Sequence, residues 1–183
     1  TIASGVCNGL GIAPQLIGEV IGITKAYCTR VGSGPFPSEL HGEVGELLRQ
    51  EGGEFGATTG RPRRCGWIDI PQLKYMIMIN GVTQLCVTKV DILNNFDEIS
   101  AATHYKIDGE LADLPPYDLC ADGIEPVYTS YPGWKQSLEG IDDYDDLPET
   151  AKSYLETLEG MLETPITIVS RGPQRKELIL KNK

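Results

Sequence analysis

A cluster of arginines follows a stretch rich in glycine and threonine, in GATTGRPRR (residues 56–64). Guanidinium groups this close repel one another unless anions lie among them, and arginine can bind a carboxylate or phosphate through two parallel hydrogen bonds. The threonine hydroxyls and the glycine backbone add further donors. The pattern predicts a loop that folds over an anionic substrate. A basic surface turn, a localisation signal or salt bridges to the protein's own acids would give the same composition.

A second candidate site follows a strand that the apolar, β-branched run predicts for residues 85–91, buried on both faces. There, Thr88-Lys89-Val90-Asp91 places a carboxylate at a strand end. A carboxylate can accept hydrogen bonds from N1–H and the 2-amino group of guanine, whereas adenine offers no such donor pair. The segment is similar to the Asn-Lys-x-Asp motif of GTP-binding proteins, with Thr88 in place of Asn. Solvent-facing charge at a strand end is the alternative.

A third candidate, Ser170-Arg171-Gly172-Pro173, ends a second predicted buried strand at residues 166–173. Its backbone and serine hydroxyl could flank the same base from the other side, although such a turn is unremarkable when taken alone. The sequence contains no GxxxxGK[ST], HExxH or GxSxG motif.

Composition limits the possible partners. The 183 residues include 16 basic and 26 acidic side chains, for a net charge of −10, which argues against binding to nucleic acids or anionic membranes. No apolar run is long enough to cross a bilayer. Five widely spaced cysteines without paired spacing predict buried apolar thiols in a reducing, cytoplasmic compartment. The start at Thr1, with no leader, suggests a piece of a longer chain.

Strands that alternate with helices predict an α/β fold, with buried strands, flanking helices and long functional loops. Besides the two strands, short strand-like pieces are expected between residues 104 and 145, and the acidic stretch 142–146 is expected to be a solvated connection rather than a metal site. The expected helices and loops are a helix over 14–27, a helix from about 38 to 52, an irregular loop over 56–67, a short helix capped by Asp69 with Pro71 in its first turn, a turn at 80–81, and a helix from Asp146 with a capping box to Glu149.

Taken together, these segments resemble the adenylosuccinate synthetase family. The resemblance is carried by GPFPSEL, EFGATTGRPRRCGWID, TKVDIL, YPGW, LPETAKSYLETLE and ITIVSRGP, in the family's order along essentially the whole chain. It implies that residues 1–183 are one C-terminal segment of the family's P-loop-NTPase-like fold. The substrate loop would cover about 56–66, and the guanine-recognition segments about 85–93 and 166–173.

The resemblance also implies an activity. Family members join inosine monophosphate (IMP) to L-aspartate to form adenylosuccinate, the committed step from IMP to AMP. They transfer the γ-phosphoryl group of GTP to the purine 6-oxygen, and the aspartate amine then displaces it. Mg²⁺ assists, and the enzyme is a cytoplasmic homodimer that needs neither nucleic acid nor membrane.

Site residues follow from the family's motifs. The substrate loop that recognises aspartate matches Ala57, Thr58, Thr59, Gly60, Arg61, Pro62 and Arg63. Within it, Arg61 would also approach IMP and Arg63 would meet GTP. The other GTP-binding positions match Lys89, Val90, Asp91, Ser170, Arg171 and Gly172. Arg171 stands where the family has Thr, which changes the side chain but leaves any backbone contact possible.

The family's phosphate-binding glycine loop, catalytic Asp and His and Mg²⁺ ligands match nothing here. We therefore expect no catalytic residue and no metal ligand in this chain, and no synthetase activity from it alone. His41 does not match the catalytic His and is expected to be a surface or packing residue. A non-catalytic guanine-nucleotide-binding module remains an alternative. A nucleic-acid-binding protein that uses the arginines fits the charge poorly.

Overall fold

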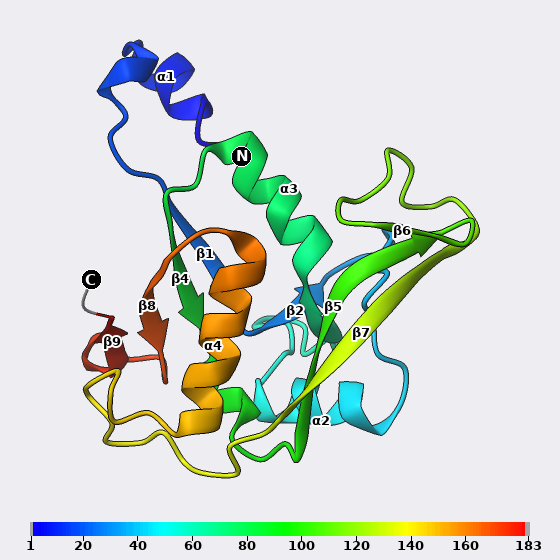
Figure 1. Ribbon diagram of the computed structural model, residues 1–183, viewed down its shortest axis with the longest axis vertical. Helices are drawn as coiled ribbons and strands as arrows, with labels where there is room; N and C mark the ends of the chain where they lie inside the picture. Colours follow the sequence, from blue (N-terminus) through cyan, green and yellow to red (C-terminus); the bar gives the residue numbers. More distant parts are fainter. Residues whose placement is uncertain (1, 182–183) are drawn as a thin grey trace.

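Two β-sheets with helices packed on and between them make up the computed structural model, which describes residues 2–181 (Figure 1). The predicted α/β class is confirmed. In chain order the α-helices, strands and short 3-10 helices (η) are α1 (Gly5–Leu10), η1 (Pro14–Leu16), β1 (Ile21–Lys25), β2 (Tyr27–Arg30), α2 (Glu43–Glu51), β3 (Arg64–Asp69), α3 (Ile70–Asn80), β4 (Gln84–Thr88), η2 (Val90–Leu93), β5 (Glu98–Ile107), β6 (Glu110–Ala112), β7 (Ile124–Pro132), α4 (Glu149–Leu162), β8 (Ile166–Ser170), η3 (Arg175–Glu177) and β9 (Leu178–Leu180).

The first sheet has the strand order β1-β4-β8-β9. Strands β1, β4 and β8 are parallel, and β9 returns antiparallel to β8. The carboxyl ends of the three parallel strands therefore lie at one edge of the sheet (Figure 1). This edge is where ligands commonly bind in sheets of this kind.

The second sheet has the order β2-β3-β5-β6, and the long strand β7 also pairs with β5. The β5–β7 ribbon extends away from the first sheet, on the right of Figure 1. The chain passes from one sheet to the other through the buried residue Ala26, whose N–H donates to the carbonyl of Thr88 at 2.8 Å. The ends of β1 and β4 are thus tied directly to the start of the second sheet.

Helix α4 supplies much of the core, as its sequence pattern predicts. Its apolar stripe is buried, and Tyr154 packs edge-on against Tyr131 at a ring-centroid distance of 5.4 Å. The predicted capping box of Asp146 and Glu149 is wrong, because the helix is preceded directly by Pro148 and no side chain caps it. The Pro148 carbonyl instead accepts from the N–H groups of Ala151 and Lys152, so the first turn closes through the backbone.

The predicted helix over residues 14–27 is wrong. Only Pro14–Leu16 is helical, and residues 21–30 form β1 and β2. Gly22 explains the choice: a Cβ atom there would lie 2.9 Å from Leu85 Cδ2 and from Val82 Cγ1, so β1 approaches β4 more closely than a larger residue allows. Glycine also weakens a helix interior, while Ile21 and Ile23 favour a strand.

Two other helix predictions are confirmed with small changes. Helix α2 ends before Gly52 as expected but begins at Glu43, some residues later than predicted. The Asp69 carboxylate caps α3 by accepting from the N–H of Gln72 at 3.1 Å, with Pro71 in the first turn. Helix α3 ends at Gly81, whose φ of 59° fits the predicted turn.

The predicted irregular loop over 56–67 is wrong from Arg64 onward, where the chain forms the largely buried strand β3. Gly66 lets the Ser38 carbonyl approach β3, since a Cβ atom there would lie 2.1 Å from that oxygen. The predicted strand over 85–91 is confirmed only to Thr88, because Lys89 adopts a φ of 60° and Asp91 lies in η2.

Two further expectations concern the middle of the chain and the cysteines. The strand-like pieces between 104 and 145 belong to the longer strands β5 and β7, while residues 142–146 form no helix or strand.

All five cysteines are free thiols. Cys65 and Cys86 are buried as expected, Cys7 and Cys28 are only partly buried, and Cys120 is exposed, so the expectation is wrong for Cys120.

The buried stripe of α4 gives a first prediction. Replacing Leu158, which is fully buried, with alanine should lower the free energy of unfolding by about 2–5 kcal/mol because it leaves a cavity. Urea unfolding followed by circular dichroism measures this change. Glu156→Ala, at an exposed position of the same helix, should change the free energy by less than about 0.5 kcal/mol. Equal effects of the two changes would mean that α4 is not part of the core.

Candidate functional site

The residues predicted to bind nucleotide gather where β1, β4 and β8 end. Lys25, the last residue of β1, is in register with Thr88, the last residue of β4. Val87 is in register with Val169, one residue before the end of β8. The two predicted guanine-recognition segments, far apart in sequence, therefore reach the same edge of the sheet.

A cleft with a volume of about 460 Å³ joins these two segments. Asp91 contributes to one wall, and Arg171 and Gly172 to another. The full lining is Glu51, Asp91, Ile92, Asn94, Asn95, Ser137, Glu139, Arg171, Gly172, Pro173 and Glu177. Of the other predicted GTP-binding residues, Val90 is fully buried in the core and Lys89 points toward a different cluster.

Asp91 carries an unsatisfied acceptor in this cleft. Its Oδ1 atom is buried and has no hydrogen-bond partner within residues 2–181. Burial raises the pKa of the Asp91 carboxyl above its usual value, and the nearby carboxylate of Glu177 acts in the same direction. A buried acceptor without a donor is costly, so a ligand that supplies a donor gains affinity here.

The turn after β8 uses most of its own polar groups. The Ser170 hydroxyl donates to the Gly172 carbonyl at 2.8 Å, and the Arg171 N–H donates to the Glu177 carbonyl at 3.0 Å. The Ser170 hydroxyl proton and the Arg171 N–H are therefore used within the turn, and the contact of this turn with a base stays a prediction. The turn contributes Arg171, Gly172 and Pro173 to the lining of the cleft.

The predicted substrate loop is a tight turn closed by its own backbone. Gly56 N–H donates to the Arg61 carbonyl at 2.8 Å, and Gly60 N–H donates to the Gly56 carbonyl at 2.8 Å. Gly60 has a φ of 65°, which side chains rarely adopt, so glycine suits this position. Thr58, Thr59 and Arg61 are exposed at the tip. Thr59 Oγ1 accepts from the Arg61 N–H at 3.3 Å.

The three arginines of the loop have different partners. Arg63 Nη1 donates to Glu54 Oε2 at 2.7 Å, and Arg64 is paired with Glu39. The Arg61 side chain has no ion pair or hydrogen bond within the described part of the chain. Salt bridges to the protein's own acids, one of the alternatives for this composition, therefore account for two of the three arginines and leave Arg61 available.

Glu54 is the centre of the most connected cluster in this region. Its side chain is fully buried and accepts hydrogen bonds at 2.6–2.9 Å. The donors come from β1, β2, the substrate loop and the end of β4. They are Lys25 Nζ, Tyr27 Oη, Arg63 Nη1 and Lys89 Nζ. One buried carboxylate thus joins both sheets, the substrate loop and the segment that leads to Asp91.

The electrostatics of this cluster favour an ionised Glu54. Burial opposes ionisation, but the four donors together outweigh it and lower the pKa of the Glu54 carboxyl from 4.5 to about 2. Burial and the adjacent carboxylate raise the pKa of Tyr27, so its hydroxyl stays protonated as a donor. Three cations face a single carboxylate, which leaves a local surplus of positive charge on an acidic protein.

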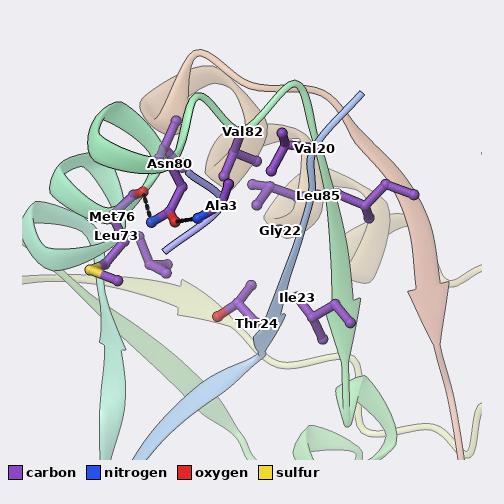
Figure 2. Close-up of a pocket in the computed structure, with 12 residues that line it drawn as sticks. Ala3, Val20, Gly22, Ile23, Thr24, Leu73, Met76, Asn80, Val82 and Leu85 are labelled. Carbon is purple, nitrogen blue, oxygen red and sulfur yellow. Dashed lines mark hydrogen bonds between the residues drawn. The ribbon is translucent and has the colours of Figure 1, made fainter. Parts of the chain in front are cut away.

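A second cavity, of about 370 Å³, lies between β1 and α3 and has a different character. Figure 2 shows its largely apolar lining and the Asn80 side chain, which accepts a hydrogen bond from Ala3 N–H at 2.9 Å. It contains no charged side chain and none of the predicted site residues. The cavity therefore offers nothing to an anionic substrate.

Other kinds of site find little support in residues 2–181. No group of three or more His, Cys, Asp or Glu side chains there is placed to hold a metal ion. His41 is exposed and lies 3.8 Å from Glu39, as a surface residue would. None of the described helices has the length and hydropathy needed to cross a membrane.

Comparisons with known proteins decide the family. The family model described as adenylosuccinate synthetase matches residues 1–179. The adenylosuccinate synthetase of Cytophaga hutchinsonii is 54% identical over 183 residues, which is 100% of this chain and 42% of that protein. That of Bacteroides thetaiotaomicron is 53% identical over 179 residues, 98% of this chain and 42% of that protein. The chain belongs to the adenylosuccinate synthetase family.

Solved structures agree with this family assignment. The fully ligated adenylosuccinate synthetase of Plasmodium falciparum superposes with a TM-score of 0.93 at 42% identity and covers 100% of this chain and 44% of that one. A cyanophage succinoaminodeoxyadenylate synthetase, at a TM-score of 0.55 and 15% identity, shares the fold alone. The chain spans about 42% of the length of the curated synthetases it matches.

Sequence analysis of this synthetase segment missed three members of the Glu54 cluster. Lys25 and Tyr27 are not predicted as site residues because the sequence pattern predicts a helix over residues 14–27 and no strand end there. Glu54 stands directly before the arginine loop, in EFGATTG, and a lone acid beside three arginines was the available signal. Its role depends on four segments that meet only in the folded chain.

The Glu54 cluster gives a second prediction. Glu54→Gln should lower the free energy of unfolding at pH 7 by about 2 kcal/mol, because three cations lose their shared carboxylate while each keeps roughly a third of its side chain in water. The folded-state pKa of Glu54 is depressed, so its contribution is complete above about pH 4.5 and is lost as the pH falls toward 2. Urea unfolding of both proteins between pH 7 and 2.5 should show the difference shrinking.

Glu46→Gln is the matched control for this prediction. Glu46 pairs with Arg49 on the surface of α2, where an ion pair contributes less than about 1 kcal/mol. A difference between wild type and Glu54→Gln that stays constant down to pH 2.5 would contradict an ionised, stabilising Glu54.

Proposed function

We propose that this chain is the nucleotide-base and aspartate-recognition part of an enzyme that joins IMP to L-aspartate at the expense of GTP, forming adenylosuccinate. The observation that carries the proposal is a buried carboxylate oxygen of Asp91 that has no hydrogen-bond partner within residues 2–181, in a residue that lines a cleft at the carboxyl ends of parallel strands. Membership of the adenylosuccinate synthetase family supports the reaction.

Asp91 would select guanine. An ionised carboxylate accepts from N1–H and the 2-amino group together, which satisfies the unpaired Oδ1 atom. Adenine would place its N1 acceptor against this carboxylate and leave the Asp91 oxygen without a donor, so ATP would be rejected.

The Glu54 cluster would serve the phosphates of GTP. Lys25, Arg63 and Lys89 leave a surplus of positive charge close to the strand end that leads to Asp91. Arg63 is the predicted GTP-binding arginine, and its pairing with Glu54 holds its guanidinium in place before a nucleotide arrives. A preorganised cation contributes more than one that must be ordered on binding.

The tip of the substrate loop would bind aspartate. Ala57, Thr58, Thr59 and Gly60 form the turn, and Pro62 and Phe55 make the bridge that closes it. Arg61 lies there with no partner in the described residues, so it can bind a carboxylate bidentately and also reach IMP. The loop would thereby orient the aspartate amine for its displacement of the activated 6-oxygen.

Mg²⁺ would assist phosphoryl transfer by stabilising charge on the phosphates. The family's motifs for the Mg²⁺ ligands and for the catalytic Asp and His match nothing in this sequence, so we assign none of these roles to residues 1–183. We also propose that the enzyme is a cytoplasmic homodimer, as the family resemblance implies.

Asp91→Asn provides the test of guanine selection. Calorimetry of the 183-residue chain should show binding of GTP and GDP and little binding of ATP. The variant should weaken GTP binding and improve xanthosine triphosphate binding, because the amide donates where xanthine has an acceptor. Reversal of a hydrogen bond to a buried charged group corresponds to about 10- to 100-fold in affinity. Equal loss with both nucleotides would show that Asp91 is structural.

Arg61→Leu tests the substrate loop in a full-length synthetase that carries this sequence. It should reduce kcat/KM for aspartate and for IMP by about 10- to 100-fold, the value of lost charge-assisted hydrogen bonds. Circular dichroism should remain unchanged because Arg61 makes no ion pair in residues 2–181. Lys106→Leu, which removes an exposed cation from β5, should leave these constants unaltered. A melted Arg61→Leu spectrum would assign Arg61 to structure.

A further inference from the structure

The Tyr27 hydroxyl lies within the Glu54 cluster, away from solvent. Tyr27 is 1% exposed, and its Oη atom donates to Glu54 Oε1 at 2.6 Å, its one hydrogen bond within residues 2–181. Gly52 makes room for this hydroxyl, because a Cβ atom at that position would collide with Tyr27 Oη. A side chain enclosed in this way touches no ligand, so any influence of Tyr27 on the reaction passes through Glu54.

The two carboxylate oxygens of Glu54 have different partners. Three donors meet at Oε1, and they come from β1, from β2 and from the residue that follows β4. They are Lys25 Nζ at 2.9 Å, Tyr27 Oη at 2.6 Å and Lys89 Nζ at 2.8 Å. Among the described residues, Oε2 accepts only from Arg63 Nη1, at 2.7 Å. Because a carboxylate is planar, the donors that fix Oε1 also determine where Oε2 lies.

Arg63 is held by Glu54 at both its backbone and its side chain. The Arg63 N–H donates to the Glu54 carbonyl at 2.9 Å, and Nη1 donates to Oε2 at 2.7 Å. The side chain is still 34% exposed, and its Nε and Nη2 atoms make no hydrogen bond to residues 2–181. The guanidinium therefore has a fixed position and keeps donors for a ligand.

We propose that Tyr27 and Glu54 are positioning residues for GTP: the Tyr27 hydroxyl orients the Glu54 carboxylate, and Oε2 of that carboxylate sets the guanidinium of Arg63 for the nucleotide. This inference rests on the proposed function, in which Arg63 meets GTP. It adds to that site two buried side chains that touch no substrate themselves. A cation that is ordered before binding stabilises the bound nucleotide more than one that must be ordered on binding.

Glutamine at position 54 separates the duties of the two oxygens. An amide accepts hydrogen bonds at one end and donates them at the other. Its oxygen is best placed at the Oε1 position, where three donors meet, and its NH₂ group then faces Arg63 Nη1, donor against donor. Arg63 thereby loses its partner, while Lys25 and Lys89 keep an acceptor. Glu54→Gln should therefore affect GTP through Arg63.

The experiment is a double-mutant cycle in a full-length synthetase that carries this sequence, read as kcat/KM for GTP. Arg63→Met should lower this constant by about 10- to 100-fold, the effect of losing hydrogen bonds from a charged donor. Glu54→Gln should lower it by about 10-fold, because the guanidinium stays but is no longer held in place. In the Arg63→Met background, Glu54→Gln should cost less than about 3-fold, since nothing remains for it to position.

Tyr27→Phe removes only the hydroxyl and provides the answer if Glu54→Gln fails to fold. It should lower kcat/KM for GTP by about 3- to 10-fold, and this loss should also vanish in the Arg63→Met background, because Tyr27 acts through Glu54.

Two matched controls carry the same chemical changes elsewhere. Glu149→Gln breaks the exposed pair with Lys152 on α4, and Tyr117→Phe removes a hydroxyl from a fully exposed residue between β6 and β7. Both should leave kcat/KM for GTP unchanged. Thermal melting followed by circular dichroism checks that each variant is folded.

The possible failures are distinguishable. If Glu54→Gln and Tyr27→Phe cost the same factor with and without Arg63, their effects are structural and the positioning role is overturned. No loss in either variant, or no loss in Arg63→Met, overturns it as well, while turnover by the enzyme stands. If the wild-type enzyme makes no adenylosuccinate from IMP, aspartate and GTP, the proposed function itself fails.

Discussion

A single buried carboxylate determines how the segments of this site sit together. Glu54 accepts hydrogen bonds from the end of β1, the start of β2, the substrate loop and the residue after β4. Isolated cations brought this close would repel one another, and burial alone would raise the pKa of the Glu54 carboxyl. The carboxylate therefore reduces the repulsion among the cations, and the cations stabilise the ionised carboxylate. The surplus positive charge that results is a property of the fold, since no single segment carries it.

Charge is divided sharply across a short distance of chain. Lys89 joins the cationic cluster around Glu54, and Asp91, two residues later, lines the acidic cleft with Arg171. This division matches a molecule with a polyanionic end and an uncharged, donor-rich end. It also shows how a net charge of −10 is compatible with a local surplus of positive charge. The global charge excludes diffuse anion binding, while a local cluster remains compatible with a specific site.

The parts of the fold that sequence predicted are those determined by local chemistry. The stripe of α4, the Asp69 cap of α3 and the apolar runs of β4 and β8 each carry their own signal, and each is present. The helix predicted over residues 14–27 is wrong because the apolar spacing of β1 fits both a helix and a strand. The close approach of Gly22 to Leu85 on β4 favours the strand. Likewise, the sequence located the arginine loop but not the internal partners of Arg63 and Arg64. Those partners come from residues that only folding brings near.

The backbone at Lys89 connects the two halves of the site. Its φ of 60° ends β4 and starts η2, and a non-glycine residue in this conformation costs about 1 kcal/mol. Lys89 Nζ donates to Glu54 at 2.8 Å and to the Gly52 carbonyl at 2.7 Å, and these bonds offset that cost. The change of direction at Lys89 places Asp91 in the wall of the cleft. The position of the Asp91 carboxylate therefore depends on the Glu54 cluster, because Lys89, which turns the chain toward the cleft, is held by the same buried acid that orders the cations.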